Sequence, residues 1–349
     1  MNPSCVLFIG LGGAGQRHLR ILRGLLPETR FIAYRKNGAT PILNPDFTVS
    51  LSQSLEDVYS IELMKSLDVA IEEHPDLVVI STPSSKHWEP LMAAAGIGAN
   101  ILLEKPWSSE LKGFGEFLNL IELNGSAFRI SFQRRFHPMM VRIHELLKSG
   151  KFGKTISANF IVGSYVPDWH KYEDWKSLYA VQPELGGGVL LTEIHEIDLA
   201  YWFFGLPKSV FCRAGNFGAE ILPVEDTASI TMDYGNFTVQ VSLCFMQRQC
   251  RRIMEISGTA GHISWDSDAN SLIYKDYNTD KNYIYEDPNY SNDSMFEAQA
   301  SAFLNDFSRS GNQEYLRAAW ASQAIVETAK KSNNEGKSVF LPEFFSEII

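Results

Sequence analysis

Two polar side chains lie in settings where they could handle charge during a reaction. Lys105 lies in "LLEKPW" (102–107), directly after an apolar run, and His195 lies in "GGGVLLTEIHEIDLAYWFFG" (186–205). An imidazole titrates near neutrality, so His195 could accept and return a proton. A lysine ammonium could polarise a carbonyl or hydroxyl oxygen. The alternatives are a solvated surface lysine and a core histidine bonded to Asp198 or to a backbone carbonyl.

The elements that must position these residues alternate regularly in the first third of the chain. Apolar runs typical of buried strands occupy residues 5–10, 30–35, 76–82 and 100–106, with amphipathic runs typical of helices between them. This alternation predicts right-handed βαβ units and an α/β fold with a parallel, doubly wound sheet. Pro106 disfavours a helical conformation at Lys105, so this lysine should project from the end of a strand.

The pattern changes near residue 126. Segments of period 2 separated by Gly, Asn and Asp turns then predominate, which indicates a mainly antiparallel sheet, and the tail returns to helix. We therefore predict a dinucleotide-binding domain over residues 1–125 and a second, α+β domain over residues 126–349.

A glycine-rich turn follows the first strand and opens the first helix. Its spacing is Gly10-x-Gly12-x-x-Gly15, within "GLGGAG" (10–15). Glycines in this context allow a tight turn and close approach to a pyrophosphate at a helix N-terminus. We predict that Gly10, Gly12, Gly13, Ala14 and Gly15 bind a dinucleotide, although a glycine turn without a ligand is the alternative.

The end of the second strand bears on the type of cofactor. An Asp or Glu there would bind the ribose 2′-hydroxyl of NAD, but the strand ends in "AYRKN" with Arg35 and Lys36. An arginine can pair bidentately with a 2′-phosphate, so the sequence favours NADP(H). If the two cations belong to a solvated loop, NAD(H) remains possible.

Polar residues also follow the third and fourth apolar runs. "STPSSKHWEP" (81–90) and "LLEKPW" lie where ligands of open α/β sheets bind, at the carboxyl ends of the strands. We predict that Thr82, Pro83, His87, Glu104 and Lys105 line the cofactor site.

The stretch around His195 is expected to form one helix, and the helical period decides which of its residues lie near His195. At about 100° per residue, Thr192 and His195 share one side, and Asp198 lies one turn further on. Glu193 falls about 160° away from His195 by the same count, which excludes it as a partner. Thr192 and Asp198 are therefore the candidate supports of His195.

Substrate contacts are expected between these motifs. Arg134 and Arg135 follow the strand-like "FRISFQ", and adjacent strand residues face opposite ways, so at most one of them should enter the site. We predict Arg135, which would suit a carboxylate or phosphate. Tyr165, Trp169 and Tyr172 lie in an aromatic, polar loop that suits a sugar, or else packs on the core or a subunit interface.

Composition excludes several classes of protein. The 349 residues carry a net charge of −10, which argues against a general binder of nucleic acid or anionic membrane. No apolar run approaches the length of a bilayer span, and the start lacks a secretory signal. Four scattered cysteines, with neither CxxC nor HExxH, predict reduced thiols, a cytoplasmic location and no metal site.

Several motifs together resemble one known family. "GLGGAGQRHL", "STPSSKH", "EKP", "FQRRFHP", "LKSGKFGK", the glycine-led stretch around His195 and "SGTAGHISWD" occur in the order of the Gfo/Idh/MocA oxidoreductases. The resemblance implies a Rossmann domain and a second domain with a large open sheet that often forms a homodimer or homotetramer. It also implies hydride transfer between a nicotinamide and a secondary alcohol of a sugar, nucleotide sugar or cyclitol, carried by Lys105 and His195.

One departure from the family pattern bears on the chemistry. Many relatives carry an Asp three or four residues before the histidine, where this chain has Thr192 or Leu191. A threonine can donate or accept a hydrogen bond but supplies no charge. This departure is the only sequence support for a second function, a non-catalytic dinucleotide-binding sensor. A third function also stays open, a sugar lyase or hydrolase that recycles a tightly bound NAD.

Overall fold

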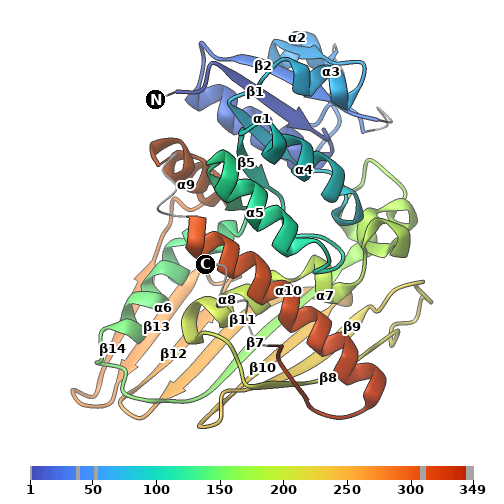
Figure 1. Ribbon diagram of the computed structural model, residues 1–349. Helices are drawn as coiled ribbons and strands as arrows, with labels where there is room; N and C mark the ends of the chain where they lie inside the picture. Colours follow the sequence, from blue (N-terminus) through green and yellow to red (C-terminus); the bar gives the residue numbers. More distant parts are fainter. Residues whose placement is uncertain (1, 37–39, 51–53, 307–311, 343–349) are drawn as a thin grey trace.

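The computed structural model describes residues 2–36, 40–50, 54–306 and 312–342, and it divides them between two sheets (Figure 1). The first sheet, drawn in blue and teal, is built from the first third of the chain. The second, drawn in green to orange, is larger and is covered by helices on one face. The α/β architecture predicted from the sequence is confirmed.

The first sheet has six parallel strands in the order β3-β2-β1-β4-β5-β6. This is the doubly wound order in which ligands bind at the carboxyl ends of the strands, where the order reverses between β1 and β4. The strands are β1 (Cys5–Ile9), β2 (Arg30–Tyr34), β3 (Ile61–Leu63), β4 (Leu77–Ile80), β5 (Asn100–Leu103) and β6 (Phe128–Ile130).

Helices cover both faces of this sheet, which explains why its strands are apolar on both sides. One face packs against α1 (Gly13–Leu25), α2 (Leu55–Tyr59) and, from far along the chain, α9 (Asn292–Asn305). The other face packs against α3 (Leu67–Glu72), α4 (Trp88–Gly96) and α5 (Phe114–Asn124).

Two strands of the first sheet bear on the sequence predictions. β3 was not predicted, because three residues at a sheet edge are too few to show a period. β6 pairs with β5 although it follows the predicted domain boundary at residue 125. We propose that the boundary lies after β6 instead.

The second sheet has nine strands in the order β14-β13-β12-β11-β7-β10-β9-β8-β15. Its neighbouring pairs are antiparallel except for β7 with β10, so the predicted mainly antiparallel sheet is confirmed. The strands are β7 (Thr155–Tyr165), β8 (Ser209–Gly215), β9 (Thr227–Asp233), β10 (Thr238–Cys244), β11 (Met246–Gly258), β12 (Gly261–Asp266), β13 (Ser271–Asp276), β14 (Lys281–Glu286) and β15 (Val339–Phe340).

The helices of the second part lie on one face of this sheet and where the two sheets meet (Figure 1). They are α6 (Pro138–Lys148), α7 (Val189–Thr192), α8 (His195–Phe204) and α10 (Asn312–Glu335). α10 packs against β8, β6 and α8, so one long helix touches both sheets. Short 3-10 turns complete the connections: η1 (Ser84–Lys86), η2 (Gln133–Phe136), η3 (Val166–Asp168), η4 (Trp175–Ser177), η5 (Tyr179–Val181) and η6 (Pro183–Leu185).

No helix in the described ranges combines the length and the apolar character needed to cross a membrane.

Candidate active site

The glycine turn between β1 and α1 leaves room where a dinucleotide would bind. Gly10 has φ +91°, and a Cβ there would lie 2.9 Å from the carbonyl oxygen of Ser81. A Cβ at Gly15 would collide with the carbonyl of Gly10, whereas one at Gly12 would have no atom within 4 Å. Gly12 caps α1, and no described side chain accepts from the first amides of the helix there, which leaves them for another acceptor. These features fit a pyrophosphate.

The two cations predicted to select the cofactor lie just after β2. Arg35 is half-buried, and its Nη1 donates to the carbonyl of Thr40 at 3.4 Å. Lys36 is exposed. Both therefore lie at the carboxyl end of the first sheet, within the region expected to hold the adenosine ribose.

His87 does not lie in the way the sequence suggested. It is 1% exposed, and its Nε2 lies 2.9 Å from the carbonyl oxygen of Thr82 while its Nδ1 lies 3.0 Å from that of Pro106. Burial lowers the pKa of this imidazole. With both ring nitrogens facing backbone carbonyls, His87 ties the segments after β4 and β5 together, and the prediction that it binds cofactor directly is corrected.

Glu104 is likewise turned into the protein. Its Oε1 lies 2.6 Å from Nε2 of His18 in α1, and its Oε2 accepts from the amide of Lys105 at 3.2 Å. Although burial raises the pKa of Glu104, the hydrogen bond and charge of His18 bring it below its usual value. Glu104 therefore fixes the backbone that carries Lys105 and couples it to α1.

Lys105 reaches across from the first sheet to the turn before α8. Its Nζ donates to the carbonyl oxygen of Thr192 at 2.8 Å. Burial by itself would lower the pKa of Lys105, but the charges of Tyr179, Glu104 and Glu193 raise it above its ordinary value. The ammonium is therefore charged at neutral pH.

The glycine-led stretch packs its backbone against Tyr179 and Ala180. A Cβ at Gly187 would lie 2.6 Å from the carbonyl oxygen of Tyr179, and Gly186 and Gly188 have φ of +80° and +107°. The predicted close approach at these glycines is confirmed. It also keeps Tyr179 near Lys105, a neighbour that sequence patterns did not reveal.

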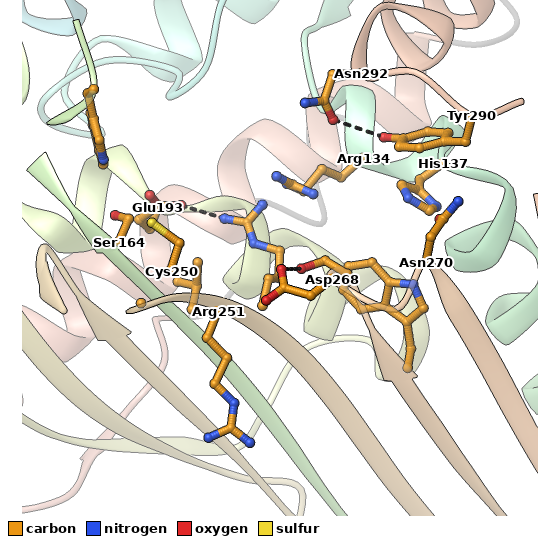
Figure 2. Close-up of a pocket in the computed structure, with 16 residues that line it drawn as sticks. Arg134, His137, Ser164, Glu193, Cys250, Arg251, Asp268, Asn270, Tyr290 and Asn292 are labelled. Carbon is orange, nitrogen blue, oxygen red and sulfur yellow. Dashed lines mark hydrogen bonds and ion pairs between the residues drawn. The ribbon is translucent and has the colours of Figure 1, made fainter. Parts of the chain in front are cut away.

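The helix predicted through His195 is interrupted. α7 ends at Thr192 and α8 begins at His195, with Glu193 at φ −95° and ψ 32° between them. A count of 100° per residue does not hold across this break. The helical count is therefore no ground for excluding Glu193, whose side chain lines a cavity that Arg134 also lines (Figure 2).

Arg252 of β11 joins two carboxylates beside the break. Its Nη2 lies 2.7 Å from Oε2 of Glu193, and its Nε lies 3.1 Å from Oε1 of Glu196. Burial raises the pKa of both glutamates, and the charges of Arg134 and Lys105 oppose that effect. Arg252 was absent from the sequence predictions, because one arginine in a long strand carries no local signal.

His195 is 5% exposed, and its Nε2 lies 3.3 Å from Nε2 of Gln133. Its Nδ1 has no hydrogen-bond partner within the described residues. Burial, with the charges of Lys105 and Arg134, lowers the pKa of His195 well below its usual value. The imidazole is therefore neutral at physiological pH. Its basic nitrogen is Nε2, because the amide nitrogen of Gln133 can only donate to it.

The two predicted supports of His195 have other contacts. The Thr192 hydroxyl is buried without a partner in the described part of the chain, and only its carbonyl meets Lys105. Asp198 accepts from Nε and Nη2 of Arg135 at 2.9 and 2.7 Å, and from Ser322 at 3.3 Å. Asp198 thus serves a buried ion pair and makes no hydrogen bond to His195 that the structure records.

The same ion pair corrects the prediction for Arg135. Its guanidinium is buried against Asp198, with Glu314 at 3.3 Å on the other side, whereas Arg134 lines the cavity. Residues 133–136 form the turn η2 rather than a strand, so alternation of strand faces does not decide between the two arginines.

The cavity has a volume of about 570 Å³, within the range of small-molecule sites. Figure 2 shows Arg134, His137 and Tyr290 on one side and Glu193, Ser164 and Cys250 on the other. The lining residues are Arg134, His137, Val162, Gly163, Ser164, Trp169, Glu193, Cys250, Arg251, Arg252, Trp265, Ser267, Asp268, Asn270, Tyr290 and Asn292.

The residues of the predicted aromatic loop lie in different parts of the structure. Trp169 lines the cavity and packs edge-on against Phe245, with ring centroids 5.0 Å apart. The Tyr172 hydroxyl instead lies 3.1 Å from where a Cβ of Gly13 would be, so this ring covers the glycine turn. Tyr165 lies under Arg248 at 4.9 Å and is outside the lining set. Of the three predicted substrate contacts, the structure thus places Trp169 in the cavity, Tyr172 at the glycine turn and Tyr165 outside the lining residues.

Two family models match this chain in turn. The model described as "Oxidoreductase family, NAD-binding Rossmann fold" matches residues 5–132. The model described as "GFO/IDH/MocA C-terminal domain" matches residues 140–264. Together they cover the first sheet, the second sheet as far as residue 264, and the elements that carry Lys105 and His195.

Individual relatives are more distant. The chain is 23% identical over 239 residues to oxidoreductase P35 of Formosa agariphila, an alignment that covers 65% of this chain and 70% of that protein. It is 24% identical over 180 residues to a 2,7-anhydro-N-acetylneuraminate hydratase of Mediterraneibacter gnavus, covering 50% and 45%. For the first four relatives, the match spans 45% to 70% of their own length.

Among solved structures, a levoglucosan dehydrogenase in complex with NADH and levoglucosan superposes with a TM-score of 0.81. The match covers 97% of this chain and 99% of that one at 16% sequence identity. At this identity the similarity establishes the fold.

Proposed function

The chain belongs to the Gfo/Idh/MocA family of NAD-binding oxidoreductases, and on that premise we propose that it oxidises a secondary alcohol, or reduces the ketone, of a sugar, nucleotide sugar or cyclitol. A bound nicotinamide dinucleotide supplies the hydride acceptor or donor. The observation that supports the proposal most strongly is the 2.8 Å contact between Lys105 Nζ and the Thr192 carbonyl, three residues before His195. This contact links the strand end of the first sheet to the helix start of the second part.

The dinucleotide would be held by the glycine turn and the open end of α1. Backbone amides there can bind the pyrophosphate, and the space beside Gly12 admits it. Arg35 and Lys36 would contact the adenosine ribose, and the two cations favour a 2′-phosphate and therefore NADP(H). The Tyr172 ring would cover the turn.

In the proposed reaction, His195 transfers the proton and Lys105 stabilises the charge on the oxygen. In the oxidation direction, the neutral imidazole accepts the hydroxyl proton as the carbon loses its hydride, and in reduction it returns that proton. The Lys105 ammonium stabilises the negative charge that develops on the oxygen. The pKa directions of both groups support these roles, because one is neutral and the other charged at pH 7.

In the family pattern a carboxylate lies close to the histidine. Glu193 is the candidate for that carboxylate in this chain. It lines the cavity, and its charge acts on Lys105. We propose that Glu193 supplies the negative charge that Thr192 cannot, which weakens the case for a non-catalytic sensor.

The cavity fits a sugar-like substrate. Trp169, Trp265 and Tyr290 offer rings for C–H faces, and Ser164, Asn270 and Asn292 offer groups for hydroxyls. A subunit interface through the second sheet, giving a homodimer or homotetramer, is part of the same proposal.

The test is a set of sugars, sugar acids and cyclitols incubated with the purified chain and either NAD or NADP. Reduction of the nicotinamide is followed by absorbance. We expect turnover with at least one alcohol, and a loss of about 10²–10⁴-fold in kcat for His195→Asn. Equal turnover by the wild type and His195→Asn would contradict the assignment of His195.

A second candidate has one specific observation in its favour. Two carboxyl groups with raised pKa, Glu193 and Glu196, lie beside His195, and a hydration or elimination needs acid–base groups beyond those of a simple dehydrogenation. One relative is named as a hydratase. Tightly co-purified NAD with product formation but no net nicotinamide reduction would support this function over the first.

A further inference from the structure

We propose that Arg134 forms an anion subsite of the cavity and binds the carboxylate of an acidic sugar. The proposal rests on the proposed function, since it names the substrate class of the same site. It begins from an arginine whose side chain enters the cavity without a partner that the structure records.

Arg134 projects from η2 into the cavity beside Glu193 (Figure 2). Its Nε is buried and has no hydrogen-bond partner among the described residues, none of whose carboxylates lies within 4.0 Å of the guanidinium. A buried donor without a partner is destabilising relative to one that is satisfied. A ligand that accepts from this guanidinium removes that cost.

The nearby carboxylates are already held by a different arginine. Arg252 pairs with both Glu193 and Glu196, at 2.7 and 3.1 Å. Arg134 acts on the same two glutamates only at longer range, as a charge that lowers their pKa. One arginine thus balances the carboxylates of the cluster, and the other is left for a ligand.

The other groups in the cavity that could carry positive charge are paired, neutral or turned away, and Arg252 is paired with Glu193 and Glu196. Burial, together with the charge of Arg134, lowers the pKa of His137 to about 4, so His137 is neutral at physiological pH. The Arg251 side chain points away from the cavity in Figure 2. Tyr290 and Asn292 lie beside Arg134 and can complete the hydrogen bonds of an anion.

One guanidinium matches a carboxylate better than a phosphate. A carboxylate carries a single charge and a planar pair of oxygens that fit the guanidinium fork. A phosphate monoester carries up to two charges and would lie in the same cavity as Glu193, where like charges repel. The proposed ligand is therefore a sugar acid.

The experiment compares acids with neutral counterparts as ligands of the cofactor-loaded protein. The pairs are D-glucuronate with D-glucose, and N-acetylneuraminate with its methyl ester, measured by calorimetry. We expect the acid of at least one pair to bind about 10- to 100-fold more tightly than its neutral counterpart, as one charge-assisted contact provides. Arg134→Met should reduce that preference to less than about threefold.

Arg213→Met is the matched control, since Arg213 is an exposed arginine of β8 outside the cavity. This control should keep the preference for the acid. The proposal is overturned by a wild type that prefers neither acid, by an Arg134→Met variant that keeps the preference, or by Arg134-dependent binding of glucose 6-phosphate that exceeds that of glucuronate.

The two proposals fail in different ways. If a neutral sugar is oxidised at the same rate by the wild type and Arg134→Met, and no acid is preferred, hydride transfer stands and the carboxylate subsite is wrong. If an acid binds through Arg134 but no nicotinamide is ever reduced or product formed, the subsite stands and the proposed chemistry is wrong.

Discussion

The glycine turn after β1 and the helix break before α8 are both led by glycines, but they are specified over very different lengths of chain. At the turn, the conformation and the open space depend on Gly10, Gly12 and Gly15, six residues in all from first to last. At the break, the groups that set the chemistry come from β5, η2, η5, α7, α8 and β11. The cofactor end, meaning the glycine turn, is therefore specified locally. The chemical end, meaning the groups around Lys105 and His195, is assembled by the tertiary fold.

This difference is visible in neighbouring residues at the chemical end. Arg134 and Arg135 are adjacent, yet one lines the cavity and the other is buried in an ion pair with Asp198. No short-range rule separates them, because the packing of α8 and α10 decides which one is buried.

The largest expected effect concerns that ion pair. Arg135→Met leaves Asp198 without its partner at 1% exposure, so we expect the free energy of unfolding to fall by about 3–5 kcal/mol. Arg134→Met removes an arginine with no ion pair and should cost less than about 1 kcal/mol. Urea denaturation of both variants gives the comparison. Similar losses in the free energy of unfolding for both variants would contradict the assignment of Arg135 to a structural ion pair and of Arg134 to a ligand.

The next effect tests the local character of the glycine turn. Gly15→Ala brings a Cβ onto the carbonyl of Gly10, so we expect the Kd of both NAD and NADP to rise about 100-fold with little change in the fold. Gly24→Ala, in the same helix with no atom near its Cβ, is the control and should bind normally. Fluorescence titration of the reduced cofactors measures both. Unchanged binding in Gly15→Ala would show that this turn does not hold the dinucleotide.

A smaller effect is expected at the end of β2. Arg35→Ala should weaken NADP binding about 10-fold and change NAD binding less than about twofold, since only NADP carries the 2′-phosphate. Arg30→Ala, at the opposite end of the same strand, is the control. NAD binding that equals or exceeds NADP binding in the wild type, and does not respond to Arg35, would reverse the cofactor preference.

The smallest effect is a pH dependence at the chemical end. Because the pKa of His195 is well below 6.5, its base form persists as the pH falls. We expect kcat/KM for alcohol oxidation to change by less than about twofold from pH 7.5 to pH 6, where an unshifted imidazole would lose about fourfold. A profile with a midpoint near 6.5 would show that His195 is not buried as described or is not the base.

The same group contributes to stability with a defined sign. Below pH 6.5 the unfolded chain binds a proton at His195 that the native state does not, so this residue lowers stability as the pH falls. Above that pH the contribution is absent. The pH dependence of unfolding in His195→Asn should therefore be shallower below pH 6.5 than in the wild type.

The sequence predicted most of what depends on short-range patterns. The parallel sheet with its glycine turn, the antiparallel second sheet and the close backbone approach at Gly187 follow from periodicity and residue type. Lys105 also projects from its strand end toward the helix of His195, as expected. These features need only a few consecutive residues to be specified.

The errors fall where a short-range rule was extended beyond its range. The helical count excluded Glu193 because it assumed one continuous helix, and the two-residue break between α7 and α8 invalidates that assumption. Strand alternation selected Arg135 although residues 133–136 form a turn. His87 and Asp198 carry polar groups suited to a site but use them to satisfy buried backbone and charge, which only tertiary packing reveals.

The central claim is that Lys105, brought beside the His195 turn by the fold, stabilises charge during hydride transfer. The most direct test is the kcat of Lys105→Met on an active alcohol, measured together with the Kd of the cofactor. We predict a loss of about 10²–10⁴-fold in kcat while the cofactor Kd changes less than about threefold. An unchanged kcat, or a cofactor affinity that falls as far as kcat does, would contradict the account.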